Sequence, residues 1–218
     1  MARKPATARK LRQNTPGNPQ SASDPRAARR EAILAAALDE FSSQGFTAAR
    51  LEDVARRAGI AKGTIYLYFR DKETLFQELV RSMLTPVIGT VEALRNADVP
   101  MRALSEHLLD VFVDQILSTR RREVIRLMIA EGRRFPKLAE FYHREVISRI
   151  FGAVRAMLER AAARGEVPPA LAQFPQLLAA PGLVAVVWTG LFDKYEPLDA
   201  RAMLRAYFDM VFSLGAKS

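Results

Sequence analysis

Apolar side chains recur three and four positions apart along most of the chain, and this spacing predicts an all-α protein with about nine helices. The sequence contains no glycine-rich hairpin, strand partner or internal repeat. The predicted helices cover approximately residues 25–45, 51–58, 62–69, 72–94, 101–118, 121–135, 136–164, 171–192 and 198–214.

The predicted helix ends carry typical start and stop residues. Asp24 followed by Pro25 is a helix start, because the carboxylate can cap the first turn and proline fits its first position. Gly45 and Gly59 end the first two helices, since glycine adopts the left-handed conformation at low cost. Pro86 lies inside the fourth helix and predicts a bend there.

Two segments have the composition of a strand. Residues 64–69, Thr-Ile-Tyr-Leu-Tyr-Phe, alternate and are rich in β-branched and aromatic side chains. Residues 182–191 are rich in valine. A single strand in an otherwise helical domain would leave its backbone groups unpaired, so both segments are predicted to be helical.

A short helix, a glycine turn and a second short helix form a helix-turn-helix pattern between residues 51 and 69. Ala55 allows close packing, Gly59 allows the turn, and Ile60 fills the junction. Ile65 then docks the second helix. This second helix is the one that enters the DNA major groove in such motifs.

A helical wheel separates the two faces of residues 62–69. Ile65 and Phe69 fall together and face the core, whereas Gly63, Thr64 and Leu67 point outward. An exposed leucine beside a glycine suits a groove, because Leu67 can contact a thymine methyl group. The alternative is an isolated surface leucine without a function.

Lys72 follows Asp71, the predicted N-cap of the fourth helix, and its charge opposes the helix dipole. A DNA phosphate bound at this helix end would compensate for that charge. The alternative is a solvated lysine that tolerates its position.

The composition narrows the class of protein. The 218 residues carry a formal net charge of +9 and a pI of about 10.2, so the partner is expected to be nucleic acid or an anionic membrane surface. There is no cysteine, which excludes disulfides, thiolate zinc sites and cysteine nucleophiles and favours the cytoplasm. No nucleophile elbow, P-loop or dinucleotide fingerprint indicates an enzyme.

Residues 1–23 contain five basic residues, three prolines and no acid, which predicts a disordered basic arm. The alternatives are an arm that contacts DNA, a tail without a role and an arginine-rich transit peptide. Residues 167–192 carry no charge but are broken by prolines, so they are predicted to be buried in protein and not to cross a membrane. The predicted division is 24–71 for the helix-turn-helix domain and 72–218 for a second helical domain.

The stretch GFTAARLEDVARRAGIAKGTIYLYFRDKETLFQEL, residues 45–79, resembles the DNA-binding domain of the TetR family of bacterial transcriptional regulators. The segment RLMIAEGRRFPKLAEFY, residues 126–142, resembles the regulatory domain of an AefR-like or AcrR-like subset. The resemblance implies major-groove contacts from Lys62, Gly63, Thr64 and Leu67. It also implies backbone and phosphate contacts from the following residues: Arg50, Tyr66, Tyr68 and Lys72.

Three positions depart from the family pattern. Ala49-Arg50 and Ala61 replace the usual capping residues before the second and third helices, which weakens two N-caps by about 1 kcal/mol each. Glu52 stands at a place that is often basic, so a phosphate contact from that position is not expected.

The resemblance further implies that the second domain binds a ligand and forms a homodimer through residues 177–192 and 198–214, which would present two recognition helices to a pseudopalindromic operator. The alternative for these helices is that they fill the core of one subunit. The expected function is a repressor released by a small hydrophobic effector. The alternative function is an architectural or adaptor helix-turn-helix protein without an effector.

Bulky side chains of the second domain are candidates for lining the ligand pocket, although aromatic residues at helical spacing also form ordinary core. These candidates are Phe112, Met128, Phe135, Phe141, Tyr142, Phe151 and Trp188. Residues 120–122 are three arginines, expected to be solvated. His107 and His143 have no third ligand in sequence, so neither a metal nor another cofactor is expected.

Overall fold

The computed structural model describes residues 24–215, with side chains to residue 213; the predicted arm 1–23 lies outside the described residues. Every element in this part of the chain is a helix, which confirms the all-α prediction. The elements are α1 Pro25–Ala48, α2 Leu51–Arg57, α3 Lys62–Ile65, α4 Lys72–Leu94, α5 Met101–Asp110, η1 Val111–Leu117, α6 Arg121–Glu131, α7 Pro136–Tyr142, η2 His143–Ile147, α8 Ser148–Ala163, α9 Pro169–Gln173, α10 Gln176–Leu191 and α11 Ala200–Gly215.

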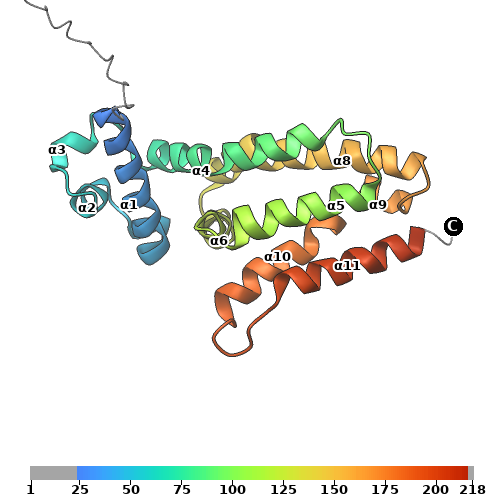
Figure 1. Cartoon of the computed structure of the whole chain (residues 1–218). Coiled ribbons are helices and arrows are strands. Elements are labelled where there is room, and N and C mark those ends of the chain that lie inside the picture. The colour runs from blue at the N-terminus through green and yellow to red at the C-terminus, as the bar shows by residue number, and fades with distance from the viewer. Residues whose placement is uncertain (1–23, 216–218) are drawn as a thin grey trace, which may run out of the picture.

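The helices form two regions joined by α4. Figure 1 shows α1, α2 and α3 at one end, with α4 leading away from them beside α8 and with α10 and α11 along the opposite side. One buried core joins α1–α3 to the first half of α4 and extends to Val124 and Leu127 of α6 and Leu138 of α7. A second core lies among α4, α5, η1, α8 and α11. The first core packs α1, which carries the helix-turn-helix on its other side, directly against α6.

Three predicted helix ends are confirmed. The Asp24 carboxylate accepts a hydrogen bond from the Arg26 backbone N–H at 3.0 Å. Gly45 has a φ of 73° and interrupts α1, and Gly59 has a φ of 67° between α2 and α3. The prediction that these glycines terminate helices is therefore correct, because both occupy the left-handed region that other residues rarely adopt.

The third helix is shorter than predicted. It ends at Ile65, and residues 66–68 form a tight turn in which Leu67 N–H donates to Thr64 O at 3.1 Å and Tyr68 N–H donates to Ile65 O at 3.0 Å. These bonds span three residues, as in a 3₁₀ turn. Branched and aromatic side chains are poor helix formers, which accounts for the early end. No strand forms within residues 24–215.

The segment 171–192, predicted as a helix broken by prolines, forms two helices, α9 and α10. Pro175 follows Phe174 at the break, where a proline removes a backbone donor and disfavours the helical conformation of the residue before it. Because α5 continues into η1, and α7 through η2 into α8, the described residues contain ten continuous helices where nine were expected. None of these helices is long and apolar enough to cross a membrane.

The arginine run is not the solvated group that was expected. Arg121 Nε donates to Met83 O at 2.6 Å, one turn before Pro86 of α4, and its Nη1 donates to Gln115 O at 2.9 Å. Arg122 Nη1 donates to Leu117 O at 2.9 Å. Carbonyl groups at helix ends lack partners within the helix, and these guanidinium groups supply donors to two such carbonyls at the end of η1. Arg121 thereby joins α6 to both α4 and η1.

Ion pairs fasten α11 to α5 and η1. Arg201 contacts Asp110 and Asp114, the latter at 2.7 Å, and Arg205 contacts Glu106 at 3.0 Å. The buried face of α11 packs into the second core through Leu204 and Phe208. The remaining face of α11 points away from its own subunit.

Candidate nucleic-acid interface and ligand pocket

The helix-turn-helix surface presents the faces that the helical wheel predicts. Ile65 and Phe69 are 0% and 2% exposed and belong to the first core. Leu67 is 77% exposed, Gly63 is exposed, and Thr64 is half-buried rather than fully outward. An apolar side chain thus projects from the turn that closes the recognition helix.

Gly63 has no packing role inside the chain. A Cβ atom built at this position meets no atom within 4 Å. Glycine costs up to about 1 kcal/mol relative to alanine inside a helix. The fold of the isolated chain therefore gives no reason for glycine here, whereas close approach of the backbone to another molecule does.

Glu52 binds two of the residues expected to contact DNA. Its Oε1 accepts a hydrogen bond from the Tyr66 hydroxyl at 2.9 Å and lies 3.2 Å from Lys62 Nζ. The Glu52 pKa is lowered, first by a backbone hydrogen bond and then by Tyr66 and Lys62, while the hydrogen bond to Glu52 raises the Tyr66 pKa. The acid that departs from the family pattern thus joins α2 to α3.

The charge of Lys72, which opposes the dipole of α4, is compensated by backbone carbonyl groups of the same chain. Its Nζ donates to Phe46 O at 2.8 Å and Thr47 O at 3.0 Å, with Ala49 O at 3.4 Å, and lies 4.8 Å from the centre of the Phe46 ring. These carbonyls belong to the last turn of α1 and its C-cap. The ammonium therefore stabilises the chain whether or not a phosphate is bound.

Both departures at the helix starts have the expected structural effect. Arg50 and Ala61 are the N-caps of α2 and α3, and neither makes a side-chain capping hydrogen bond. Arg50 is exposed. Tyr68 is half-buried, with the Arg26 guanidinium 6.0 Å from its ring centre. Glu40, which is buried on α1, receives Arg57 Nη2 at 2.9 Å and so fixes α2 against α1.

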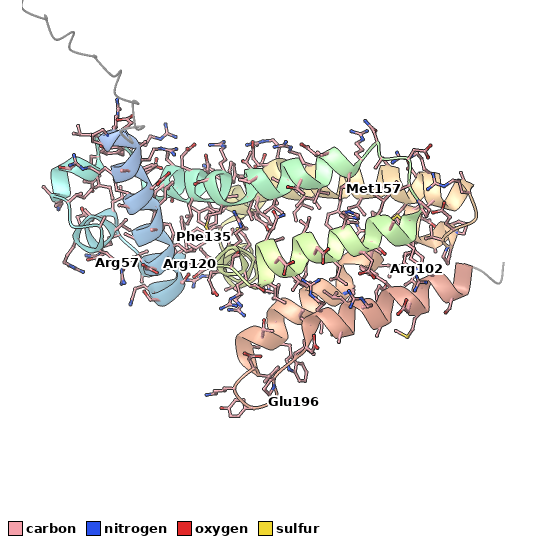
Figure 2. All side chains as sticks on the ribbon, viewed as in Figure 1. Arg57, Arg102, Arg120, Phe135, Met157 and Glu196 are labelled. Atoms are coloured by element: carbon pink, nitrogen blue, oxygen red, sulfur yellow. The ribbon has the colours of Figure 1, made fainter. Side chains whose placement is uncertain are left out.

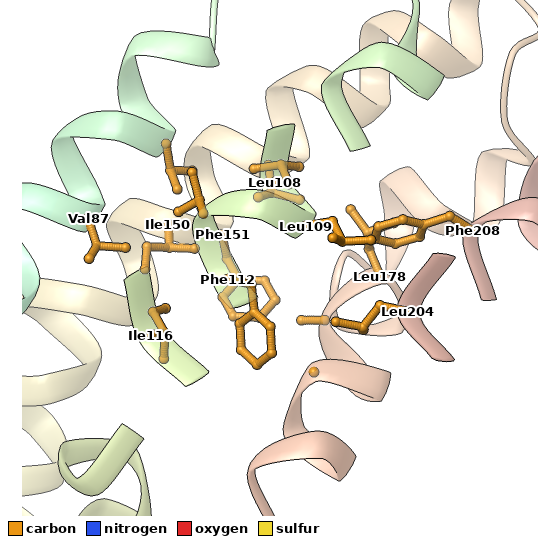
Figure 3. Close-up of a pocket in the computed structure, with 15 residues that line it drawn as sticks. Val87, Leu108, Leu109, Phe112, Ile116, Ile150, Phe151, Leu178, Leu204 and Phe208 are labelled. Atoms are coloured by element: carbon orange, nitrogen blue, oxygen red, sulfur yellow. The ribbon is translucent and has the colours of Figure 1, made fainter. Parts of the chain in front are cut away.

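Two cavities lie in the C-terminal region. The larger has a volume of about 720 Å³ and lies among α4, α6, α7, η2, α8 and α10. The smaller has a volume of about 160 Å³ and lies beside α5 and α11. Figure 3 shows Phe112 at the centre of the smaller cavity, between a group with Ile116 and Val87 and a group with Leu178 and Leu204. Six residues line both cavities, which are therefore adjacent: Val87, Phe112, Ile116, Ile150, Phe151 and Ala179.

Four of the seven predicted pocket residues line a cavity: Phe112, Met128, Tyr142 and Phe151. Phe135, Phe141 and Trp188 line neither of the two cavities. Phe135 packs edge-on against Phe46 at 4.7 Å, where α6 meets α1 (Figure 2), and Phe141 is buried in the first core. Trp188 donates its indole N–H to Glu196 O at 2.9 Å and packs on Phe192.

Small and polar residues complete the pocket, and the sequence reasoning missed them. Gly182 lines the smaller cavity, and a Cβ atom there would lie 3.1 Å from the Phe112 ring. Arg133, His143 and Gln176 line the larger cavity. Both π-helical segments, η1 and η2, contribute to the walls, and π-helical turns occur often at functional sites. Gly182, a glycine within a run of bulky apolar residues, was the sequence feature that could have indicated this part of the pocket.

Comparison with known families agrees with this arrangement. Residues 33–79 match the family described as "Bacterial regulatory proteins, tetR family", and residues 102–210 match "Tetracyclin repressor-like, C-terminal domain". The chain belongs to the TetR family. The first matched segment contains the helix-turn-helix and the second contains most of the residues that line the two cavities, so the TetR assignment covers both regions of this structure.

Curated relatives in the TetR family match part of the chain. The chain is 38% identical over 81 residues to the HTH-type transcriptional regulator RutR of Escherichia coli K12, covering 37% of this chain and 38% of RutR. It is 33% identical over 102 residues to AcrR of Shigella flexneri, covering 45% and 47% of the two chains. The chain thus matches less than half the length of these two relatives.

Solved structures extend the likeness to the whole TetR fold. The SmeT–triclosan complex has a TM-score of 0.67 and 22% identity, covering 84% of this chain and 89% of SmeT. NalD of Pseudomonas aeruginosa has a TM-score of 0.64 and 22% identity, covering 85% and 98%. At these identities the likeness concerns the fold.

Only one face of the α10 helix of this TetR-family chain is buried in its own subunit. Its exposed large apolar side chains are Leu177, Leu183, Val184, Val187 and Leu191. The alternative that this uncharged segment only fills the core of one subunit therefore does not account for its exposed face. Successive turns of α11 also expose Ala202, Ala206 and Met210.

Proposed function

We propose that this protein is a homodimeric, sequence-specific DNA-binding repressor of transcription that a small hydrophobic effector releases from its operator. Its place of action is the cytoplasm. Residues 24–71 form the DNA-binding unit and residues 72–218 the regulatory unit. The exposed Leu67 beside Gly63 carries the proposal, because a fold that buries Ile65 and Phe69 has no use of its own for either residue.

We assign the DNA contacts as follows. Lys62, Gly63, Thr64 and Leu67 enter the major groove, and Leu67 contacts a thymine methyl group. Tyr66 and Tyr68 hold phosphates. Arg50, at the start of α2, contacts the DNA backbone. Lys72 contacts a phosphate while its ammonium stays hydrogen-bonded to the end of α1.

The exposed apolar side chains of α10 support a homodimer. Val184, Val187 and Leu191 recur at helical spacing on one face, and Met210 lies exposed on the neighbouring α11. Monomeric proteins rarely expose such continuous apolar surface. A twofold contact would bury this surface against its copy and present two recognition helices to two half-sites.

The cavities support regulation by a ligand. A largely apolar cavity of about 720 Å³ has the size of a drug-like ligand site. The structural relative SmeT is described in complex with triclosan, and NalD as the secondary repressor of a multidrug efflux pump. Ligand binding would favour the dimer state whose recognition helices do not match the operator spacing.

Selection of bound duplexes from a random DNA pool tests the proposal. The full chain should enrich a pseudopalindrome, and Leu67→Ala should lose discrimination at one base pair. Replacing thymine by uracil at that base pair should weaken the wild type and leave Leu67→Ala unchanged. Failure to enrich any sequence would refute the proposal.

The alternative is an architectural helix-turn-helix protein without an effector. Thermal-shift measurements against hydrophobic ligands separate the two functions, because a ligand that binds the folded chain raises its stability in proportion to saturation. A regulator should be stabilised by at least one ligand and then release its operator.

A further inference from the structure

The two cavities differ in the chemistry of their walls. The smaller cavity is lined by apolar side chains and one glycine alone. The larger cavity is also mainly apolar, but its lining includes the polar side chains of Arg133, Tyr142, His143 and Gln176. All of the polar lining therefore lies in one cavity, and the neighbouring cavity offers an apolar extension.

The polar end has a positive charge without an acid beside it. Among the described residues that line either cavity, none is Asp or Glu. Arg133 is exposed, as are His143 and Gln176, so this polar lining lies where the larger cavity meets solvent, and within residues 24–215 the Arg133 side chain makes neither an ion pair nor a hydrogen bond to the protein. This differs from Arg126 on the same helix, which pairs with Glu123 at 2.8 Å and donates to Thr189 at 3.2 Å.

Neighbouring groups can also donate hydrogen bonds to an anion. Burial raises the pKa of Tyr142 to about 12, so its hydroxyl keeps its proton at neutral pH. Gln176 opens α10, a helix of 16 residues whose dipole favours negative charge at this end, although the N–H groups of Leu177 and Leu178 already donate to Phe174 O and Pro175 O. Arg133, Tyr142 and Gln176 therefore select for a negatively charged head.

The apolar end lies beyond the Phe112 ring. Phe112 and Phe151 line both cavities, and the Phe112 ring occupies the space that a side chain at position 182 would fill. Figure 3 places Phe112 beside Phe151 and faces it toward Leu178, Leu204 and Phe208. Rotation of one ring would join the two cavities into a longer apolar channel.

We propose that the effector is an amphipathic carboxylic acid. Its carboxylate pairs with Arg133 in the larger cavity, and its aliphatic chain runs past Phe112 into the smaller one. This inference rests on the proposed ligand-regulated function and specifies the class of ligand.

Three probes with the same chain test the head group: dodecanoic acid, 1-dodecanol and dodecylamine, each below its aggregation concentration. Calorimetry on the full chain should show that the acid binds most tightly, the alcohol less tightly and the amine most weakly. Arg133→Gln should weaken the acid about tenfold, the size of one charge-assisted hydrogen bond, and leave the alcohol unchanged. Arg134→Gln, which removes a neighbouring exposed arginine outside the cavity lining, should change neither.

A chain-length series tests the apolar end. Affinity should rise from hexanoic to tetradecanoic acid by up to about fourfold per added CH₂ group. Phe112→Leu should favour the longest acids over the shortest. The proposal is overturned if none of the probes binds, if the acid has no advantage over the alcohol, if that advantage persists in Arg133→Gln, or if affinity does not grow with chain length.

Binding of selected DNA by the ligand-free chain is measured in parallel. A chain that binds no duplex fails as a repressor, whatever the ligand data show. A chain that binds its operator but prefers the alcohol or the amine remains a repressor with a different effector class. The two proposals therefore fail through different measurements.

Discussion

The Tyr66 hydroxyl donates a hydrogen bond to the Glu52 carboxylate 2.9 Å away, so a residue proposed to hold a DNA phosphate is held by an acid of its own chain. The same oxygen lies 3.2 Å from Lys62 Nζ. DNA binding must therefore either break this arrangement or place a carboxylate close to the phosphates. Both cost binding free energy.

Removing the charge should relieve that cost. Glu52→Gln is expected to bind all duplexes roughly threefold to tenfold more tightly, the effect of one nearby charge near a surface. The salt dependence should steepen by about 0.9 in the slope if Lys62 becomes free to contact a phosphate. Fluorescence anisotropy at several salt concentrations measures both quantities.

Asp53→Asn is the matched control, because Asp53 is the neighbouring acid on α2 and pairs with Arg56 on the outer surface at 2.7 Å. An equal gain in both variants would mean that net charge alone acts. No gain for Glu52→Gln would refute the competition between Glu52 and phosphate.

Gly63→Ala separates folding from DNA binding. Because a Cβ atom there meets nothing within 4 Å, the free energy of unfolding should stay the same or rise by up to about 1 kcal/mol, and the thermal midpoint should follow it. DNA affinity should fall, since the methyl group occupies the space that the DNA backbone or a base edge needs. Calorimetry and band-shift titration on one preparation measure the two effects. Loss of stability with unchanged DNA affinity would contradict this role.

Lys72→Ala should affect both stability and DNA binding. Its ammonium satisfies carbonyls of residues 46 and 47, so its loss should cost about 1–2 kcal/mol in the free energy of unfolding. DNA affinity, measured well below the unfolding midpoint, should fall by a similar factor for all sequences. Urea unfolding gives the first quantity and competition band shifts the second. A change in sequence preference instead would argue against a phosphate contact.

Asp71 should give stability an acid-side pH dependence. Its carboxylate accepts the Thr74 N–H at 2.7 Å as the N-cap of α4, and its pKa is lowered chiefly by its hydrogen bond with Thr74. A lowered pKa in the folded state means that the stabilisation is complete above the unfolded pKa and is lost as pH falls through the folded value.

Asp71→Ala should therefore lose about 1 kcal/mol at neutral pH, whereas Asp71→Asn keeps most of the cap. Urea unfolding across acidic pH should show a smaller loss of stability for Asp71→Asn than for the wild type. Identical pH profiles would show that this carboxylate contributes nothing.

Val184→Asp should disrupt the proposed dimer. The side chain is 52% exposed in the single chain, so its replacement should leave the fold intact while placing a charge in the twofold contact. Light scattering after size exclusion should report a monomer, and operator binding should weaken. Val99→Asp, at a half-exposed valine in the turn before α5, is the control and should remain dimeric. A monomeric wild type would contradict the dimer directly.

The sequence predicted those features that depend on local geometry. Gly45 and Gly59 end helices because of their own backbone preference, and the burial of Ile65 and Phe69 follows from helical spacing. These are properties of short segments, so the pattern of residues contains the necessary information.

The sequence could not predict contacts that depend on how helices are placed together. Glu52 and Tyr66 are 14 residues apart, and their hydrogen bond requires the angle between α2 and α3. Likewise, Phe135 and Phe151 are both aromatic residues in segments predicted to be helical. Only the packing of the helices decides that Phe135, the N-cap of α7, packs on Phe46 of α1 while Phe151 borders a cavity.

Arg121 has a genetic consequence. Its guanidinium holds carbonyls of α4 and η1 from the first turn of α6, yet it belongs neither to the helix-turn-helix nor to the cavity lining. We expect Arg121→Ala to leave operator recognition and ligand affinity intact and to weaken the coupling between them. In a reporter screen such an allele would score as non-inducible, because the repressor would stay on its operator when the ligand is bound. An assay that measures DNA binding alone or ligand binding alone would not detect the defect.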